Sequence, residues 1–284
     1  MKTDGLFTVS SYSIPIRSGV PFRLVFFGDV HRDSPSHADG KWQEFLTEAR
    51  QMKDAYFIGM GDYLDSQSTS ERRCLSSSEL HDSTLNDLQM LAAQKVKLLA
   101  KELGFMRGRL IGLLNGNHYF SFSDGTNSDM KLCGELGCTY LGVSVFIRLS
   151  LSMPKASSKT GLDMWLHHGS GGSGRLLGGS INKIDQMREH AEADIYALGH
   201  DHKRGVVPAT PRLFLDDNSR AGLRVRERQQ WLCRTGSFLA SYTPGTRNYN
   251  VDAGRGPCSL GHVELVVTPK ISEGHTTLSM RGVS

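Results

Sequence analysis

The chain has 284 residues, 38% of them hydrophobic and 22% charged, which is ordinary globular composition and enough length to bury a full core. Its formal net charge is only +4, and no dense run of lysine and arginine marks a nucleic-acid-binding surface. The five cysteines form no C-x-x-C pair, which argues against a zinc knuckle or a disulfide framework and favours a reducing compartment.

The sequence shows no membrane or targeting segment. Residues 1–19 lack an uninterrupted apolar core of signal-peptide length, and no apolar run reaches the ~18 residues that a membrane span needs. We therefore expect no membrane contact and a cytoplasmic location. No proline-rich, serine-rich or charged linker interrupts the middle of the chain, so we predict a single domain over residues 1–284.

Short apolar runs bounded by glycine predict buried strands in the first two-thirds of the chain. They cover residues 23–27, 55–58, 109–114, 162–166 and 194–198. Apolar residues at helical spacing predict helices between them. These helices cover residues 39–52, 83–103, 127–136 and 180–192.

Residues 139–149 and the C-terminal part, residues 203–284, are richer in extended patterns than the rest of the chain. The C-terminal stretches cover residues 204–215, 222–235 and 260–281. Alternation of strand and helix followed by strands predicts an α/β domain with two packed sheets. Ligands of open α/β sheets bind beyond the carboxyl ends of the strands, so polar residues that follow the strands should converge at one edge.

Such polar residues follow each of the five predicted strands. The candidate metal ligands are Asp29 and His31, Asp62, Asn117, one of His167 and His168, and His200 and His202. Their oxygen and nitrogen ligands suit Mn, Fe, Zn or Ni and exclude soft Cu(I) and iron–sulfur chemistry. The set is too large for one tetrahedral ion but suffices for two, if one carboxylate bridges them.

The spacing within the motifs is consistent with that chemistry. Because strand side chains alternate, we expect Asp29 and His31 to point to the same side at a strand end, and likewise His200 and His202. Asn117 supplies a neutral oxygen, which leaves positive charge on the metals for a phosphate group.

The ordered motifs D-x-H, G-D-x-x-D, G-N-H, H-G and G-H-x-H, within residues 28–202, resemble the calcineurin-like metallophosphoesterase superfamily. The resemblance implies an αββα sandwich of two packed mixed sheets flanked by helices, with two divalent metals at the sheet edge, Mn first and Zn, Fe or Ni as alternatives. It further implies a hydrolase that attacks a phosphate ester with a metal-bridging hydroxide.

The resemblance also implies a role for each motif residue. One metal would be bound by Asp29, His31 and His202, the other by Asn117, His200 and the H-G histidine, with Asp62 as the bridge. His118 would assist the leaving group. His168 directly precedes Gly169, whereas His167 fits an H-x-G pattern, so both remain candidates for the H-G ligand.

Departures from the family pattern indicate the branch. Ser66 stands where protein Ser/Thr phosphatases usually carry arginine, and His31 and Asp65 differ from the purple acid phosphatase pattern. We therefore favour a phosphodiesterase, with a cyclic nucleotide or a nucleic acid as possible substrate; a phosphomonoesterase, a nuclease and an inactive metal-binding scaffold are the alternatives. Tyr119 replaces the acidic residue that often follows G-N-H, which leaves the support of His118 open.

Three further features have two interpretations each. The glycine-rich residues 169–179 predict either a phosphate cradle with Arg175 as anion clamp or a flexible connector. The serine-rich residues 66–82 predict a surface loop or a lid, and Asp65 either orients a ligand or caps a helix. The region from Thr235 to Tyr249 is similar to phosphoesterases encoded by bacteriophages, which would place the protein in the host cytoplasm.

Overall fold

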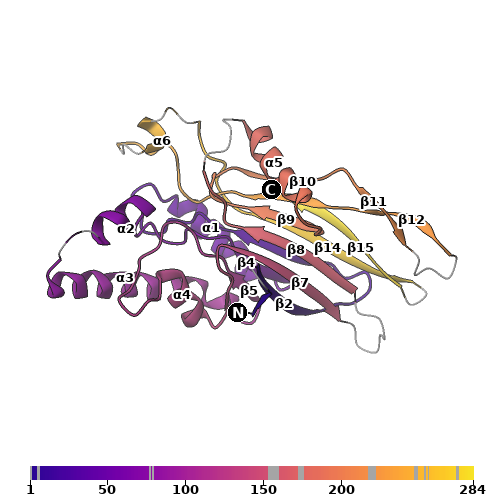
Figure 1. Ribbon diagram of the computed structural model, residues 1–284, viewed down its shortest axis with the longest axis horizontal. Helices are drawn as coiled ribbons and strands as arrows, with labels where there is room; N and C mark the ends of the chain where they lie inside the picture. The colour runs from indigo at the N-terminus through magenta and orange to yellow at the C-terminus, as the bar shows by residue number, and fades with distance from the viewer. Residues whose placement is uncertain are drawn as a thin grey trace.

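A computed structural model describes most of the chain. The described residues are 2–4, 7–76, 78, 80–152, 160–171, 176–216, 222–245, 249–252, 254, 256–272 and 275–284. Two sheets pack face to face and helices lie outside them, as Figure 1 shows. This arrangement confirms the predicted α/β fold with two mixed sheets flanked by helices.

The first sheet has six strands in the order β15-β14-β3-β4-β5-β6. Their bounds are β3 Phe22–Phe27, β4 Ala55–Gly59, β5 Leu110–Leu113, β6 Thr139–Tyr140, β14 Val263–Ser272 and β15 His275–Val283. β3 to β6 are parallel, and β14 joins β3 antiparallel. The C-terminal part of the chain therefore completes a sheet whose centre is built by the N-terminal part.

The second sheet has seven strands in the order β1-β2-β7-β8-β9-β13-β10. Their bounds are β1 Lys2–Asp4, β2 Phe7–Pro15, β7 Ser144–Ser152, β8 Thr160–His167, β9 Ile195–Leu198, β10 Arg204–Pro208 and β13 Trp231–Thr235. β8, β9 and β13 run parallel, so the carboxyl ends of β8 and β9 lie at the same edge. The N-terminal strands β1 and β2 were not predicted from the sequence.

Helices cover both outer faces of the sandwich. They are α1 Asp39–Gln51, α2 Thr69–Ser76, α3 Asp82–Leu103, η1 Gly104–Met106, α4 Ser128–Leu136, α5 Leu177–Asp185, η2 Gln186–Glu189 and α6 Tyr249–Asp252. The stripe of α1 that includes Trp42 and Phe45 packs with Val25 and Phe57 on the six-stranded sheet. Ile184 of α5 packs on the other sheet, and a third apolar cluster fills the space between the sheets.

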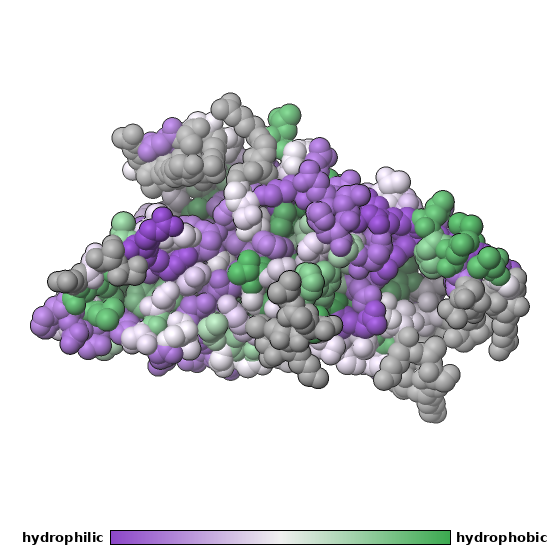
Figure 2. Space-filling model, in the orientation of Figure 1, coloured by the Kyte–Doolittle hydropathy of each residue, from purple (hydrophilic) through white to green (hydrophobic). Residues whose placement is uncertain are grey.

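The predicted extended stretches 204–215 and 222–235 are each divided into two strands. Pro211 lies in the break of the first, between β10 and β11, and proline cannot donate a ladder hydrogen bond. Among the described strands, the outer halves, β11 Arg212–Asp216 and β12 Arg224–Arg228, pair only with each other. This ribbon projects from the sandwich, and Figure 2 shows apolar side chains gathered on it.

The structure also bears on the expectations for the serine-rich segment and for membrane spans. Residues 69–76, within the serine-rich segment predicted as a loop or lid, form helix α2. None of the helices in the described part of the chain combines the length and apolar character needed to cross a bilayer.

Candidate metal centre

The candidate ligands lie just beyond strand ends of both sheets. Asp29 and His31 follow β3, Asp62 follows β4, Asn117 and His118 follow β5, His168 follows β8, and His200 and His202 follow β9. Because β3, β4 and β5 are parallel, as are β8 and β9, their carboxyl ends gather these residues where the two sheets meet.

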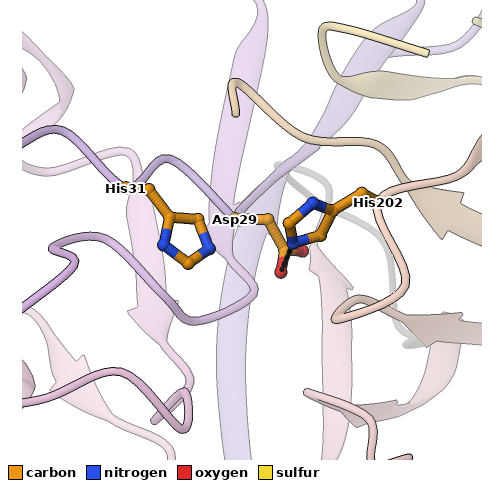
Figure 3. A group of neighbouring side chains, drawn as sticks. All are labelled: Asp29, His31 and His202. Atoms are coloured by element: carbon orange, nitrogen blue, oxygen red, sulfur yellow. Dashed lines mark ion pairs between the residues drawn. The ribbon is translucent and has the colours of Figure 1, made fainter. Parts of the chain in front are cut away.

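The first group consists of Asp29, His31 and His202, whose ligand atoms lie within 4.8 Å of one another. Figure 3 shows the Asp29 carboxylate directed at the His202 ring, with the His31 ring on its other side. His202 Nε2 lies 3.4 Å from Asp29 Oδ1. Neither Asp29 Oδ1 nor His31 Nε2 has a hydrogen-bond partner among the described residues, although both atoms are buried. Buried polar atoms normally have partners, so these two fit a bound cation.

The second group consists of Asp62, His168 and His200, again with ligand atoms within 4.8 Å. His168 Nε2 lies 3.3 Å from Asp62 Oδ2 and 3.0 Å from the side-chain oxygen of Asn117. The other ring nitrogen, Nδ1, lies 2.7 Å from the carbonyl of Met60, which fixes it as the donor. The lone pair of Nε2 is thereby left for a metal, as in many histidine sites.

Asp62 lies between the two groups. Its Oδ1 accepts hydrogen bonds from the backbone N–H groups of Asn117, at 2.7 Å, and His118, at 2.8 Å. Its Oδ2 lies 3.8 Å from His31 Nε2 in one group and 3.3 Å from His168 Nε2 in the other. One carboxylate oxygen is therefore held by the G-N-H turn and the other faces ligands from both groups, which fits a bridging ligand.

Five residues of this site adopt the left-handed backbone conformation, with positive φ. Only five non-glycine residues in the described chain have positive φ, and all are candidate ligands: Asp29 (47°), His31 (44°), Asp62 (52°), His200 (72°) and His202 (57°). Each such residue costs on the order of 1–3 kcal/mol, and such strain clusters at functional sites. The strand alternation expected for the D-x-H and H-x-H pairs is therefore wrong, because the pairs lie in turns beyond the strands.

Two glycines leave room for the ligands. A Cβ atom on Gly116 would lie 2.0 Å from Asp62 Oδ1, and one on Gly61 would lie 2.5 Å from His168 Nδ1. Gly61 also has a φ of 101°, which L-residues rarely adopt. Gly61 and Gly116 are thus required by close contact with the candidate ligands.

His118 is supported by Asp65. Its Nδ1 lies 2.8 Å from Asp65 Oδ1, and the same oxygen is 3.1 Å from Nδ1 of His31. Burial lowers the pKa of His118, but the adjacent carboxylates of Asp65 and Asp62 outweigh it, so that the pKa lies above its ordinary value. Asp65 therefore places a carboxylate against both His118 and the candidate ligand His31, whereas the residue after His118 is Tyr119.

Two candidate residues from the sequence are not brought into this arrangement. His167 belongs to β8, and its Nδ1 accepts a hydrogen bond of 2.7 Å from the backbone of Gly169. It joins none of the three groups of possible metal ligands found among the described residues, the third being His31, Asp65 and His118, whereas His168 joins one of them. Arg175 lies outside the described residues.

A buried network behind the G-H-x-H turn was missed from the sequence. Arg234 on β13 is 1% exposed and donates to Asp201 Oδ2 at 2.6 Å and to the carbonyl of Gly199 at 3.1 Å. Its Nε also bonds Ser180 on α5. Asp201 stands between His200 and His202, so Arg234 holds the G-H-x-H turn through the Asp201 carboxylate and the Gly199 carbonyl. A lone arginine in a strand gives no local signal of this contact.

Comparisons with known proteins give structural likeness at low similarity. No family model matches the sequence, and no curated protein matches it. The structure is similar to zinc-bound Vps29 from Entamoeba histolytica, with 11% identity, a TM-score of 0.39, and 92% of this chain and 99% of that chain covered. A metallophosphoesterase from Sphaerobacter thermophilus has 10% identity and a TM-score of 0.31, with 93% of this chain and 89% of that one covered.

A third similar structure is the NAD nucleotidase of Haemophilus influenzae, with 10% identity, a TM-score of 0.40, and 94% of this chain and 50% of that chain covered. At these identities and TM-scores, the assignment of function rests on the residues of the site itself.

Proposed function

We propose that this protein is a dinuclear metal-dependent phosphoesterase that hydrolyses phosphodiesters. The observation that carries the proposal is the pair of ligand groups, Asp29–His31–His202 and Asp62–His168–His200, with the free Asp62 oxygen facing ligands from both. The order of the motifs, which resembles that of calcineurin-like metallophosphoesterases, supports the same reaction class.

The donor set fits two divalent ions. Asp29, His31 and His202 would hold one, while Asn117, His168 and His200 would hold the other, with Asp62 shared. Carboxylate, amide and imidazole ligands suit Mn first, with Zn, Fe and Ni as alternatives. Bound there, the ions would supply Lewis-acid charge that neutralises the phosphate oxygens and activates water for attack.

His118 is the candidate proton donor. Its side chain is 26% exposed, so it is open to a substrate, and Asp65 fixes its Nδ1. In the metal-free chain, the Asp65 carboxylate favours the protonated form of this imidazole and raises its pKa. In this proposal His118 gives its Nε2 proton to the departing alkoxide, while Asp65 stabilises the imidazolium.

Phosphodiesters are the proposed substrate class because of the motif departures. Ser66 replaces the arginine that follows G-D-x-x-D in protein phosphatases, so the site lacks that contact to a doubly charged phosphate monoester. A diester carries one negative charge fewer, which two metal ions can neutralise without an added arginine.

The test is hydrolysis of bis-p-nitrophenyl phosphate by metal-stripped protein, with and without Mn²⁺. We expect turnover only with added metal, and a fall of roughly 10²–10⁴-fold in kcat for His118→Ala, the range for loss of a general acid. His190→Ala is the matched control, because its side chain is exposed and lies outside the site. Parallel assays with p-nitrophenyl phosphate distinguish a phosphomonoesterase from a phosphodiesterase. Metal binding without turnover of either substrate would instead indicate an inactive metal-binding scaffold.

A further inference from the structure

The Arg72 side chain of helix α2 contacts the turn of the G-N-H motif, residues 116–119. Among the α2 residues with described side chains none is buried, and only Arg72 and Leu75 are partly covered. The helix begins with a capping box, in which the Glu71 carboxylate accepts from the Ser68 N–H at 2.7 Å. This cap places Arg72 in the first turn of the helix, facing the G-N-H turn.

The Arg72 guanidinium forms hydrogen bonds with the backbone of the G-N-H turn. Its Nη1 donates to the carbonyls of Asn117, at 2.8 Å, and Tyr119, at 3.2 Å. The same Nη1 donates to the Gln67 carbonyl at 2.5 Å, which ties the segment before α2 to the turn. The guanidinium also stacks on the Tyr119 ring, with Cζ 3.7 Å from the ring centroid. Tyr119 thus serves as a platform for the arginine.

These contacts hold the peptide group that joins Asn117 to His118 at both ends. Its N–H donates to Asp62 Oδ1 at 2.8 Å, and its C=O accepts from Arg72 at 2.8 Å. A charged donor on the carbonyl polarises the peptide and strengthens the N–H bond to Asp62. The contact therefore connects α2 with both the proposed bridging carboxylate and the proposed proton donor.

From this geometry we infer that Arg72 is a positioning residue, which sets the place of His118 and of the Asp62 carboxylate through the backbone of the turn. Its donors are directed at carbonyl oxygens and its face is on Tyr119, so it is not a phosphate ligand. The expected effect on catalysis rests on the proposed function. The contacts of Arg72 with the Asn117 and Tyr119 carbonyls and with the Tyr119 ring, which we call the clamp, are a property of the metal-free chain.

The first measurement is hydrogen–deuterium exchange of metal-free protein, followed in peptides that cover residues 115–120. We expect faster exchange there in Arg72→Ala, while peptides from β8 exchange as in the wild type. Arg73→Ala is the matched control, because it removes the same charge from the next, exposed position of α2. Unchanged exchange at residues 115–120, or a uniform rise over the whole chain, would overturn the clamp.

The second measurement is kinetic, with Mn²⁺ and the diester substrate. A small displacement of a catalytic group costs about tenfold to a hundredfold in rate, so we expect kcat of Arg72→Ala to fall by that factor with KM changed less than about twofold. Added guanidinium ion should restore part of the loss, and Tyr119→Phe, which keeps the ring, should stay close to wild type. A rise in KM alone would instead make Arg72 a substrate contact.

The two measurements separate the two hypotheses. If the wild type shows no metal-dependent hydrolysis, the proposed function fails, yet the exchange experiment still decides the clamp. If hydrolysis is found and Arg72→Ala turns over like Arg73→Ala, the clamp inference fails and the proposed function stands.

Discussion

Two buried carboxylates, Asp29 and Asp62, lie close together at the centre of the site and are surrounded by imidazoles. Burial raises the pKa of each, but the neighbouring histidines together outweigh it, led by His202 at Asp29 and by His168 at Asp62. Both pKa values therefore lie below the ordinary value for aspartate, and both groups are charged and ready to bind a cation at neutral pH.

At the residue scale, the contact between Asp65 and His118 makes a prediction about coupling. Asp65→Asn keeps the shape but removes the charge 2.8 Å from His118 Nδ1, so we expect kcat to fall by about tenfold to a hundredfold. Because the two residues act as one unit, Asp65→Asn combined with His118→Ala should be little worse than His118→Ala alone. Fully multiplicative losses in steady-state assays would contradict this coupling.

A second residue-scale prediction concerns Asp129, which is buried behind the G-N-H turn and accepts from the Gly116 N–H at 3.1 Å. Burial raises its pKa to about 7, from 3.8. The folded state therefore holds this proton more tightly than the unfolded state, and the resulting stability is lost as pH rises from about 4 through about 7.

Urea unfolding of metal-free wild type and Asp129→Asn checks this dependence. We expect the free energy of unfolding of the wild type to fall relative to the variant between about pH 4 and about pH 7, with about 1.4 kcal/mol for each pKa unit involved. The comparison cancels the titration of all other groups. A difference between the two proteins that stays constant over this range would rule out the raised pKa.

At the element scale, the turns beyond the strands build the site. β3 and β4 end at Phe27 and Gly59, and the chain then turns through left-handed residues at Asp29 and Asp62. The backbone bonds from the N–H groups of Asp29 and Val30 to the Gly61 and Asp62 carbonyls hold these turns against each other. The parallel strands therefore set the distance between motifs, and the turns set the direction of the ligands.

The Gly116 turn gives a prediction at this scale. In Gly116→Ala the new Cβ would lie 2.0 Å from Asp62 Oδ1, so the carboxylate must move and activity should be lost by 10²-fold or more, roughly the cost of a displacement of about 1 Å. Gly134→Ala is the control, because Gly134 lies in α4 and a Cβ atom added there would meet no other atom within 4 Å. That change should stabilise the protein by about 0.5–1 kcal/mol without loss of turnover. Equal activity of the two variants would contradict the packing argument.

At the scale of the whole molecule, the site joins the two sheets. The Asp29 and Asp62 turns leave the six-stranded sheet, whereas His168, His200 and His202 follow strands of the seven-stranded sheet. The His200 N–H donates to Asp29 Oδ2 at 3.0 Å across this junction. Metal ions held by both sides would act as a cross-link that exists only in the folded state.

Metal binding should therefore raise the thermal stability of the entire chain. A ligand present at a hundred times its Kd adds about 2.7 kcal/mol to the free energy of unfolding, which scanning calorimetry detects as a higher Tm. We expect this rise with Mn²⁺ or Zn²⁺, its reversal by a chelator, and a much smaller rise in Asp62→Ala. An equal rise in wild type and variant would place the metal elsewhere.

The sequence by itself determined the α/β class, the five strands that precede the motifs and the identity of the candidate ligands. These features are encoded locally, by apolar runs of strand length, by helical spacing in α1 and α3, and by glycine and polar residues directly after the strands. The sequence could not show that His168, and not His167, is directed at Asp62. The two are adjacent histidines, and only the structure shows in which direction each side chain points.

Only the tertiary structure decided the contacts that connect distant segments. The pairing of Asp65 with His118, of Arg72 with the Asn117 carbonyl, and of Arg234 with Asp201 each joins residues far apart in the chain. Such pairs depend on the order of strands and on the course of the turns, which packing of the two sheets fixes and no local pattern records. The sequence thus indicated the candidate ligands, and the fold supplied the residues that contact them and their turns.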